Sequence, residues 1–161
     1  MSAEIQMSGK LAPREAWGAP GDSCPIARTF ETLGTKTAYV LMREAFYGAT
    51  RFEEFVERTG ISEPVAAARL RELTAHGLLE KVPYREPGQR TRHEYRLTAK
   101  GEDLLPVLVA MMRWGDRWLF PNGARVELTH AGCGGRVHAA LECEHDHHVA
   151  PDELQLGSRG R

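Results

Sequence analysis

Apolar residues recur three and four positions apart in four short segments of the first half of the chain. This is the period of an amphipathic helix, and a glycine closes each segment, which is a common helix stop. Ser62 stands at the expected N-cap of the fourth segment, whose Val65, Leu70 and Leu73 should face the core. The pattern therefore predicts helices over residues 24–33, 35–47, 51–58 and 63–76.

The third and fourth of these helices are separated by only four residues, Thr59-Gly60-Ile61-Ser62. Two short helices joined by a tight, glycine-containing turn form a helix-turn-helix, in which the second helix enters the DNA major groove. Residues 63–76 are therefore the expected recognition helix.

Apolar and polar residues then alternate at 78–84 and 92–97, on either side of a basic segment at 85–91. This favours an antiparallel hairpin with a basic tip. Thr98 caps a predicted long helix that continues to Leu119, shortly before Pro121. Its apolar residues occupy more than one stripe, which is more than a single core requires and indicates a subunit interface.

Together the patterns predict an α+β, mainly α fold: a winged helix-turn-helix with a two-stranded wing, a long C-terminal dimerisation helix and a small C-terminal hairpin extension. We expect a disordered N-terminal arm at 1–22, a DNA-binding and dimerisation domain at 23–120 and a Cys/His-rich extension at 121–161. No apolar run approaches the roughly 20 residues of a membrane span. We therefore expect a cytoplasmic protein with no membrane partner.

The net charge of −1 hides an uneven distribution of charged residues. Between Lys81 and Lys100, six basic residues stand against two acidic ones, whereas 141–154 holds five acidic residues and no Lys or Arg. Because phosphate binding needs clustered Lys and Arg, the basic segment is the one expected to face a polyanion such as double-stranded DNA.

Several short motifs follow one another in a characteristic order: Cys-Pro-Ile at 24–26, Leu-Met-Arg-Glu at 41–44, Arg-Phe-Glu-Glu-Phe at 51–55, Gly-Ile-Ser at 60–62, Arg-Leu-Arg-Glu-Leu at 69–73, Gly-Leu-Leu at 77–79, Glu-Tyr-Arg-Leu-Thr at 94–98 and Trp-Gly-Asp-Arg-Trp at 114–118. In their order and spacing, residues 24–119 resemble the HxlR-like family of winged-helix transcriptional regulators. The resemblance implies DNA binding as a homodimer, with an interface made by the final helix and the N-terminal segment. It also implies a frequent response to a small-molecule or electrophile effector.

The candidate DNA contacts lie at the start of the recognition helix and in the wing. A recognition helix contacts base edges and phosphates through its first turns, which favours Ser62, Glu63, Pro64, Ala66, Ala67, Arg69 and Arg71, with Arg69 foremost. In the wing, Arg90 and Arg92 can reach the minor groove or its phosphates, and Arg51 can bind a flanking phosphate. The alternative is that these arginines are solvated, with Arg69 and Arg71 paired to Glu63 or Glu72.

Apolar residues of the first and last helices are the candidates for the dimer interface: Ile26, Phe30, Leu108, Met111, Met112, Trp114 and Trp118. Cys24 lies one residue before the first helix, whose N-terminus would stabilise a thiolate. Cys24 is therefore a candidate redox or electrophile sensor, and the alternative is a buried, inert thiol.

The C-terminal extension concentrates soft and imidazole ligands: His130, Cys133, Cys143, His145, His147 and His148. Strand-like stretches at 125–130 and 136–142 would bring Cys133 and Cys143 to neighbouring turns, as a tetrahedral zinc site requires. Zinc is therefore the candidate cofactor. A plain hairpin with a His-rich end and an intramolecular disulfide are the alternatives.

The chain has no Gly-rich phosphate loop, no His-Glu-x-x-His and no nucleophile motif, so we do not expect an enzyme. The predicted function is a homodimeric, sequence-specific transcriptional regulator, in the first instance a repressor. It would contact the major groove with residues 63–76 and flanking DNA with the wing at 85–92. The alternatives are a winged-helix protein-interaction module and a metal-responsive regulator that uses the C-terminal tail.

Overall fold

A computed structural model describes residues 5–8, 24–85, 87–88 and 90–157, and the chain divides into two compact units. One unit is Arg28–His138, and the other combines Met1–Ala27 with Ala139–Arg161. This division differs from the predicted domains, because residues 121–138 group with the winged helix and the N-terminal residues group with the C-terminal ones. Among the described residues, no helix has both the length and the apolar character needed to cross a membrane.

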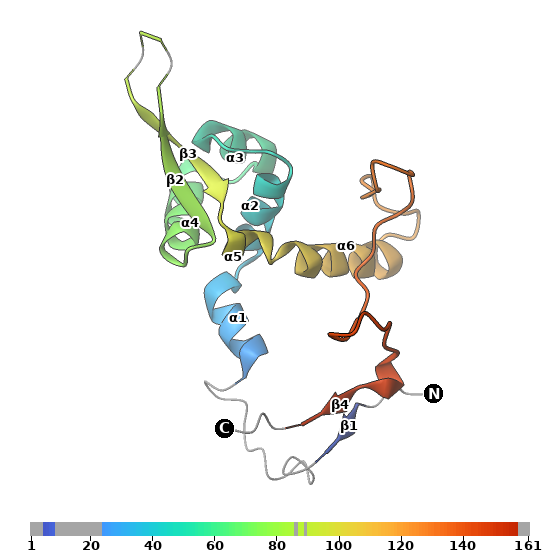
Figure 1. The fold of residues 1–161 in the computed structure, drawn as a ribbon. Coiled ribbons are helices and arrows are strands. Elements are labelled where there is room, and N and C mark those ends of the chain that lie inside the picture. Colours follow the sequence, from blue (N-terminus) through green and yellow to red (C-terminus); the bar gives the residue numbers. More distant parts are fainter. Residues whose placement is uncertain (1–4, 9–23, 86, 89, 158–161) are drawn as a thin grey trace. The chain divides into compact units, whose positions relative to one another are not determined.

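Four short helices open the main part of the fold, and their predicted positions are confirmed to within two residues at each end. They are α1 (Pro25–Leu33), α2 (Lys36–Phe46), α3 (Phe52–Thr59) and α4 (Glu63–Ala75), and Figure 1 shows the last three gathered beside the hairpin. Thr35 begins α2 by accepting a hydrogen bond from the Ala38 N–H. Gly60 ends α3 in the left-handed conformation, at φ 66°, which favours glycine.

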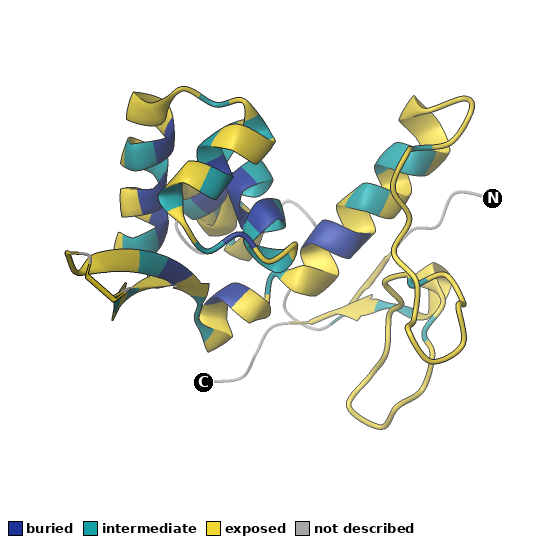
Figure 2. Ribbon diagram, turned by 90° about the horizontal axis from the view of Figure 1, so that it is seen from above, coloured by how far each residue is buried: buried dark blue, intermediate teal, exposed yellow. Residues whose placement is uncertain are grey.

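The core lies where α2 packs against α3 and α4, and Figure 2 shows the buried positions on the sides of these helices that face each other. Phe55 is completely buried and meets Tyr95 edge to face, with ring centroids 5.9 Å apart. The predicted core residues Leu70 and Leu73 are confirmed. The core cluster comprises Leu33, Ala38, Leu41, Met42, Ala49, Phe55, Leu70, Leu73, Leu78, Leu79, Tyr95 and Leu108.

The wing is the predicted antiparallel hairpin of β2 (Leu79–Tyr84) and β3 (Arg92–Leu97). Leu79 pairs with Leu97 at its base and Tyr84 with Arg92 near its tip. The Tyr95 N–H donates to the Thr50 carbonyl at 2.7 Å, which joins β3 to the segment before α3. The hairpin is therefore tied to the helix-turn-helix by backbone as well as by the core.

The single long helix predicted after Thr98 is wrong, because the structure has two helices there. α5 (Ala99–Glu102) ends at Asp103, and α6 (Leu105–Leu119) begins after Leu104. Pro106 explains the break, since it has no N–H to donate to the Glu102 carbonyl and its ring would clash with that carbonyl. Thr98 does cap the first piece, as predicted, by accepting from the Gly101 N–H at 3.1 Å.

The strands predicted at 125–130 and 136–142 are also wrong. The described residues have only isolated bridges in this region, between Thr129 and Arg136 and between Glu142 and His148. These segments are almost entirely exposed, so no core face favours a longer ladder. The unit that combines Met1–Ala27 with Ala139–Arg161 contains the 3-10 helix η3 (Pro151–Glu153). It also contains a short parallel pair of strands, β1 (Gln6–Met7) and β4 (Gln155–Leu156). The disorder predicted for 1–22 is therefore wrong at Gln6–Met7, and most of that range lies outside the described residues.

Candidate nucleic-acid interface

The turn between α3 and α4 is fixed by local hydrogen bonds. The Thr59 hydroxyl donates to the Phe55 carbonyl at 2.6 Å, and its oxygen accepts from the Ile61 N–H at 3.2 Å. Together with the left-handed Gly60, these contacts set the direction in which the chain enters α4. The helix-turn-helix geometry expected from the Thr59-Gly60-Ile61-Ser62 spacing is therefore present.

The start of α3 is held by the carboxylate of Glu54. Its Oε2 accepts from the N–H groups of Thr50 and Arg51 at 2.8 and 2.9 Å, and its Oε1 accepts from Arg58 at 3.2 Å. The two backbone hydrogen bonds are the main cause of a lowered pKa of Glu54, and the nearby positive charges of Arg58 and Arg51 add to it. Glu54 therefore positions the backbone from which the Arg51 side chain extends.

The exposed face of α4 differs from the predicted one, because Ala66 is buried and Ala67 is only half-exposed. Ala66 is completely buried beside Leu70 and Leu73, so its predicted contact with DNA is wrong. Val65, expected in the core, is 45% exposed, and Ala68 is exposed on the same side. Residues 66, 70 and 73 lie on one side of the helix at helical spacing. This spacing alone could have predicted that residues 65 and 68 face solvent. The exposed face comprises Ser62, Glu63, Pro64, Val65, Ala68, Arg71, Glu72 and Ala75.

The two arginines of α4 have different surroundings. Arg69 is half-buried and forms an ion pair with Glu72, as in the alternative interpretation of this residue. Arg71 is exposed and has no ion-pair partner among the described residues. Arg71 is therefore the cation of α4 most available to DNA, in place of Arg69.

The wing carries a row of exposed basic residues that includes Arg85, Arg90 and Arg92, while Glu86 and Gln89 lie outside the described residues. The Arg51 guanidinium lies over the Tyr84 ring, 4.9 Å from its centroid, and Tyr84 pairs with Arg92 across the hairpin. Arg51 and Arg92 are therefore brought together through Tyr84, a connection that sequence spacing did not indicate. Arg96 instead forms an ion pair with Glu94.

Of the predicted interface residues, Ile26, Phe30, Met111, Trp114 and Trp118 are exposed, the two tryptophans by 60% and 62%. The prediction of Leu108 as an interface residue is wrong, because Leu108 is buried in the core of this chain. Met112 is half-buried and its sulfur accepts from the Tyr47 hydroxyl at 3.7 Å. Cys24 is half-buried and directly precedes α1.

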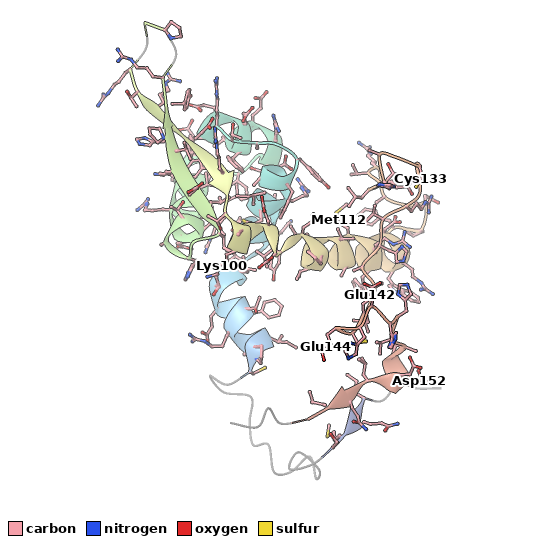
Figure 3. The ribbon with its side chains drawn as sticks, viewed as in Figure 1. Lys100, Met112, Cys133, Glu142, Glu144 and Asp152 are labelled. Atoms are coloured by element: carbon pink, nitrogen blue, oxygen red, sulfur yellow. The ribbon has the colours of Figure 1, made fainter. Side chains whose placement is uncertain are left out.

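The predicted metal ligands fall into two sets. His130 and Cys133 lie in the unit Arg28–His138, with Nδ1 and Sγ 3.2 Å apart, and Figure 3 labels Cys133 on its turn. Cys143, His145, His147 and His148 lie in the other unit, where His148 pairs with Glu142 at 3.2 Å. Within the described part of the chain, no three metal-ligating residues are grouped as an ion requires, so zinc stays a prediction. All three cysteines are free, without the alternative disulfide.

Comparison with known proteins agrees with this geometry. A family model described as HxlR-like helix-turn-helix matches residues 32–122. An HTH-type transcriptional regulator of Mycobacterium tuberculosis is 39% identical over 121 residues, which are 74% of this chain and 75% of the relative. Among solved structures, PA1607, named as a transcription factor, has a TM-score of 0.75 at 35% identity over 86% of this chain and 96% of that chain. The redox regulator HypR in its reduced form has a TM-score of 0.52 at 30% identity, over 58% of this chain and 91% of that chain.

Proposed function

The chain belongs to the HxlR-like helix-turn-helix family of transcriptional regulators, a class of DNA-binding proteins and not of enzymes, and we propose that it is a homodimeric, sequence-specific repressor. The observation that carries the proposal is the outward face of α4, whose Arg71 is engaged by no ion pair among the described residues. A helix that begins directly after a tight turn and exposes such a face is suited to the major groove.

The wing would bind DNA beside the recognition helix. Arg90 and Arg92 are exposed there, and a narrow minor groove attracts arginine through its negative potential. Arg51, placed over Tyr84, would add a phosphate contact at the same end of the hairpin. These contacts fix position and contribute affinity, whereas α4 supplies specificity.

Dimerisation would bury the exposed apolar side chains of α1 and α6. Ile26 and Phe30 on α1 and Trp114 and Trp118 on α6 are each more than half exposed, and large apolar side chains exposed in this way are typical of an interaction surface. Two copies related by a twofold axis would present two α4 helices to half-sites about 34 Å apart, one turn of DNA.

Selection of bound duplexes from random DNA, followed by titration at several salt concentrations, tests this function. We expect a pseudo-palindromic sequence that is bound at least ~10³-fold more tightly than its scramble. Arg92→Ala should weaken binding to every sequence and lower the salt slope by about 1, and Arg71→Ala should relax preference at individual base pairs. Arg125→Ala, at an exposed arginine outside both elements, is the matched control. If no sequence is enriched, or if Arg71→Ala weakens selected and scrambled DNA equally, base recognition by α4 is contradicted.

A second role, redox sensing through Cys24, is favoured by the place of this thiol directly before α1 and by the likeness to HypR, which is named as a redox regulator. Oxidation there would alter a helix that we assign to the dimer interface. Without oxidant, the Cys24→Ser variant should bind DNA with the affinity of the unchanged protein. At a hypochlorite concentration that releases the unchanged protein from its operator, the variant should remain bound. Release of both proteins at the same dose would exclude this thiol as the sensor.

A further inference from the structure

A cavity of about 740 Å³ lies between α2, α6 and residues 120–137, all within the unit Arg28–His138. This is within the range of roughly 300–1,000 Å³ that is typical of sites for organic ligands. The cavity is not part of the α4 face or the wing, and it therefore needs an explanation apart from DNA binding.

Two walls of the cavity are apolar faces of helices. Tyr39 and Val40 line it from α2, Tyr47 lines it from the position directly after α2, and Leu108, Val109 and Met112 line it from α6. The hydrogen bond from the Tyr47 hydroxyl to the Met112 sulfur joins these walls, and Figure 3 labels Met112 on α6. Aromatic rings and a thioether of this kind pack well against an aromatic ligand.

The third wall is the chain that follows α6, and specific contacts hold it in place. The Asp116 carboxylate of α6 accepts from the Ala124 N–H at 2.6 Å. Further along, the Val137 N–H donates to the Leu128 carbonyl at 2.8 Å, and Arg136 forms an ion pair with Glu127. The chain itself thus covers this side of α6 and leaves less room for a second copy there.

The charged groups of the lining favour an anion. Arg43 pairs with Glu44, Arg136 pairs with Glu127, and the Asp116 carboxylate is occupied by a backbone N–H. Arg113 also lines the cavity and, among the described residues, has no ion-pair partner. A guanidinium that is left available beside an apolar wall is suited to a carboxylate or sulfonate.

Gly115 provides a route to test the cavity directly. It lines the cavity from α6, on the stripe of Leu108 and Met112, where a glycine is less favourable to a helix than alanine. A Cβ built at Gly115 would meet no atom within 4 Å. A methyl group introduced here would therefore meet open space, and a larger side chain would extend from the wall of the cavity.

We propose that this cavity binds an aromatic organic anion of one or two fused rings, with its rings against Tyr47 and Met112 and its acidic group at Arg113. The assignment rests on the cavity and does not require the proposed function. If the protein is the repressor described above, such an anion is its effector, because α2 lines the cavity and packs against both α3 and α4.

The test is a fluorescence titration of the full chain with 8-anilinonaphthalene-1-sulfonate, an aromatic anion, in the absence of DNA. Only the signal displaced by 2-naphthoate is counted, because the dye also binds exposed apolar surfaces. Gly115→Phe should weaken this binding at least ~10-fold, which corresponds to about 1.4 kcal/mol, while Gly115→Ala changes it little. Arg113→Gln, at an exposed position, should remove the preference for 2-naphthoate over its neutral analogue 2-naphthamide.

Three results would overturn the proposal. The first is unchanged dye binding by folded Gly115→Phe protein. The second is equal competition by 2-naphthamide and 2-naphthoate in the unchanged protein. The third is dissociation of the dimer by Gly115→Phe in light scattering, which would make this face of α6 a subunit contact. Since operator binding is measured separately, a failed cavity and a failed repressor are distinct outcomes.

Discussion

Replacing thymine by uracil in the bound DNA tests how α4 distinguishes base pairs. Val65 and Ala68 form an apolar part of its exposed face, and apolar side chains of this kind contact the thymine methyl group. Helix α4 contains no Asn or Gln, the side chains that usually hydrogen-bond to adenine. We therefore expect its A·T pairs to be recognised through methyl contacts, and Arg71 to recognise guanine.

The expected penalty follows from the area of one methyl group. Val65 is 45% exposed, so it has surface left to bury against a base. Burial of one methyl contributes about 0.8 kcal/mol, and its loss should weaken binding about fourfold at one position. Because a homodimer meets two half-sites in the same way, symmetric replacement should weaken binding about 15-fold if the two losses add.

The assay is fluorescence anisotropy at fixed salt, with thymine replaced by uracil at one symmetric pair of positions at a time. Uracil keeps the hydrogen-bonding groups of thymine, so only the methyl is removed. Val65→Ala should reduce the uracil penalty at one position and leave it unchanged at the others, which serve as internal controls. If uracil duplexes bind as tightly as thymine duplexes at every position, apolar base recognition by α4 is refuted.

Three further predictions concern stability and assembly. Glu54→Ala should lower the free energy of unfolding by about 1 kcal/mol at pH 7. Since folding lowers the pKa of Glu54, the difference in unfolding free energy between the two proteins should be complete above the pKa of the unfolded state. It should disappear as the pH falls through the pKa of the folded state, as measured by urea titrations. Phe55→Ala should cost roughly 3–5 kcal/mol, because Phe55 is completely buried against Tyr95, and a loss under 1 kcal/mol would contradict this packing. Trp118→Asp should raise the dimer dissociation constant at least ~10-fold in analytical ultracentrifugation, whereas Trp118→Phe should leave it nearly unchanged. If both variants have the same dissociation constant, this face of α6 is not the interface.

The helices could be predicted because several local signals agreed at each of them. The apolar period, the Thr98 cap and the glycine stops all follow from chain geometry near one position. The break between α5 and α6 was not predicted, although Pro106 indicates it, because the apolar period continues on both sides of the proline. A proline in the first turn of a new helix and a proline inside a long helix give the same apolar spacing.

The division of α4 between core and surface could not be decided from residue type. Valine is more apolar than alanine, so Val65 was expected inside, yet Ala66 is the buried residue. Ala66 lies on the same stripe as the buried Leu70 and Leu73, and which stripe of a helix faces the core is a property of tertiary packing. The cavity beside Gly115 was missed for a similar reason, since its third wall comes from a segment with almost no regular structure.

The helix-turn-helix and the wing are one mechanical element, and this decides how α3 contributes to DNA binding. Glu54 holds the N–H groups of Thr50 and Arg51, and the carbonyl of the same Thr50 receives the Tyr95 N–H of the wing. Glu54, which is not among the proposed DNA contacts, thus helps to set the distance between α3 and β3, and through Arg51 and Tyr84 the position of Arg92 in the wing. Loss of the Glu54 carboxylate should thus weaken binding by the wing at a pH where the protein remains folded, and the salt slope of binding should fall as it does for Arg92→Ala.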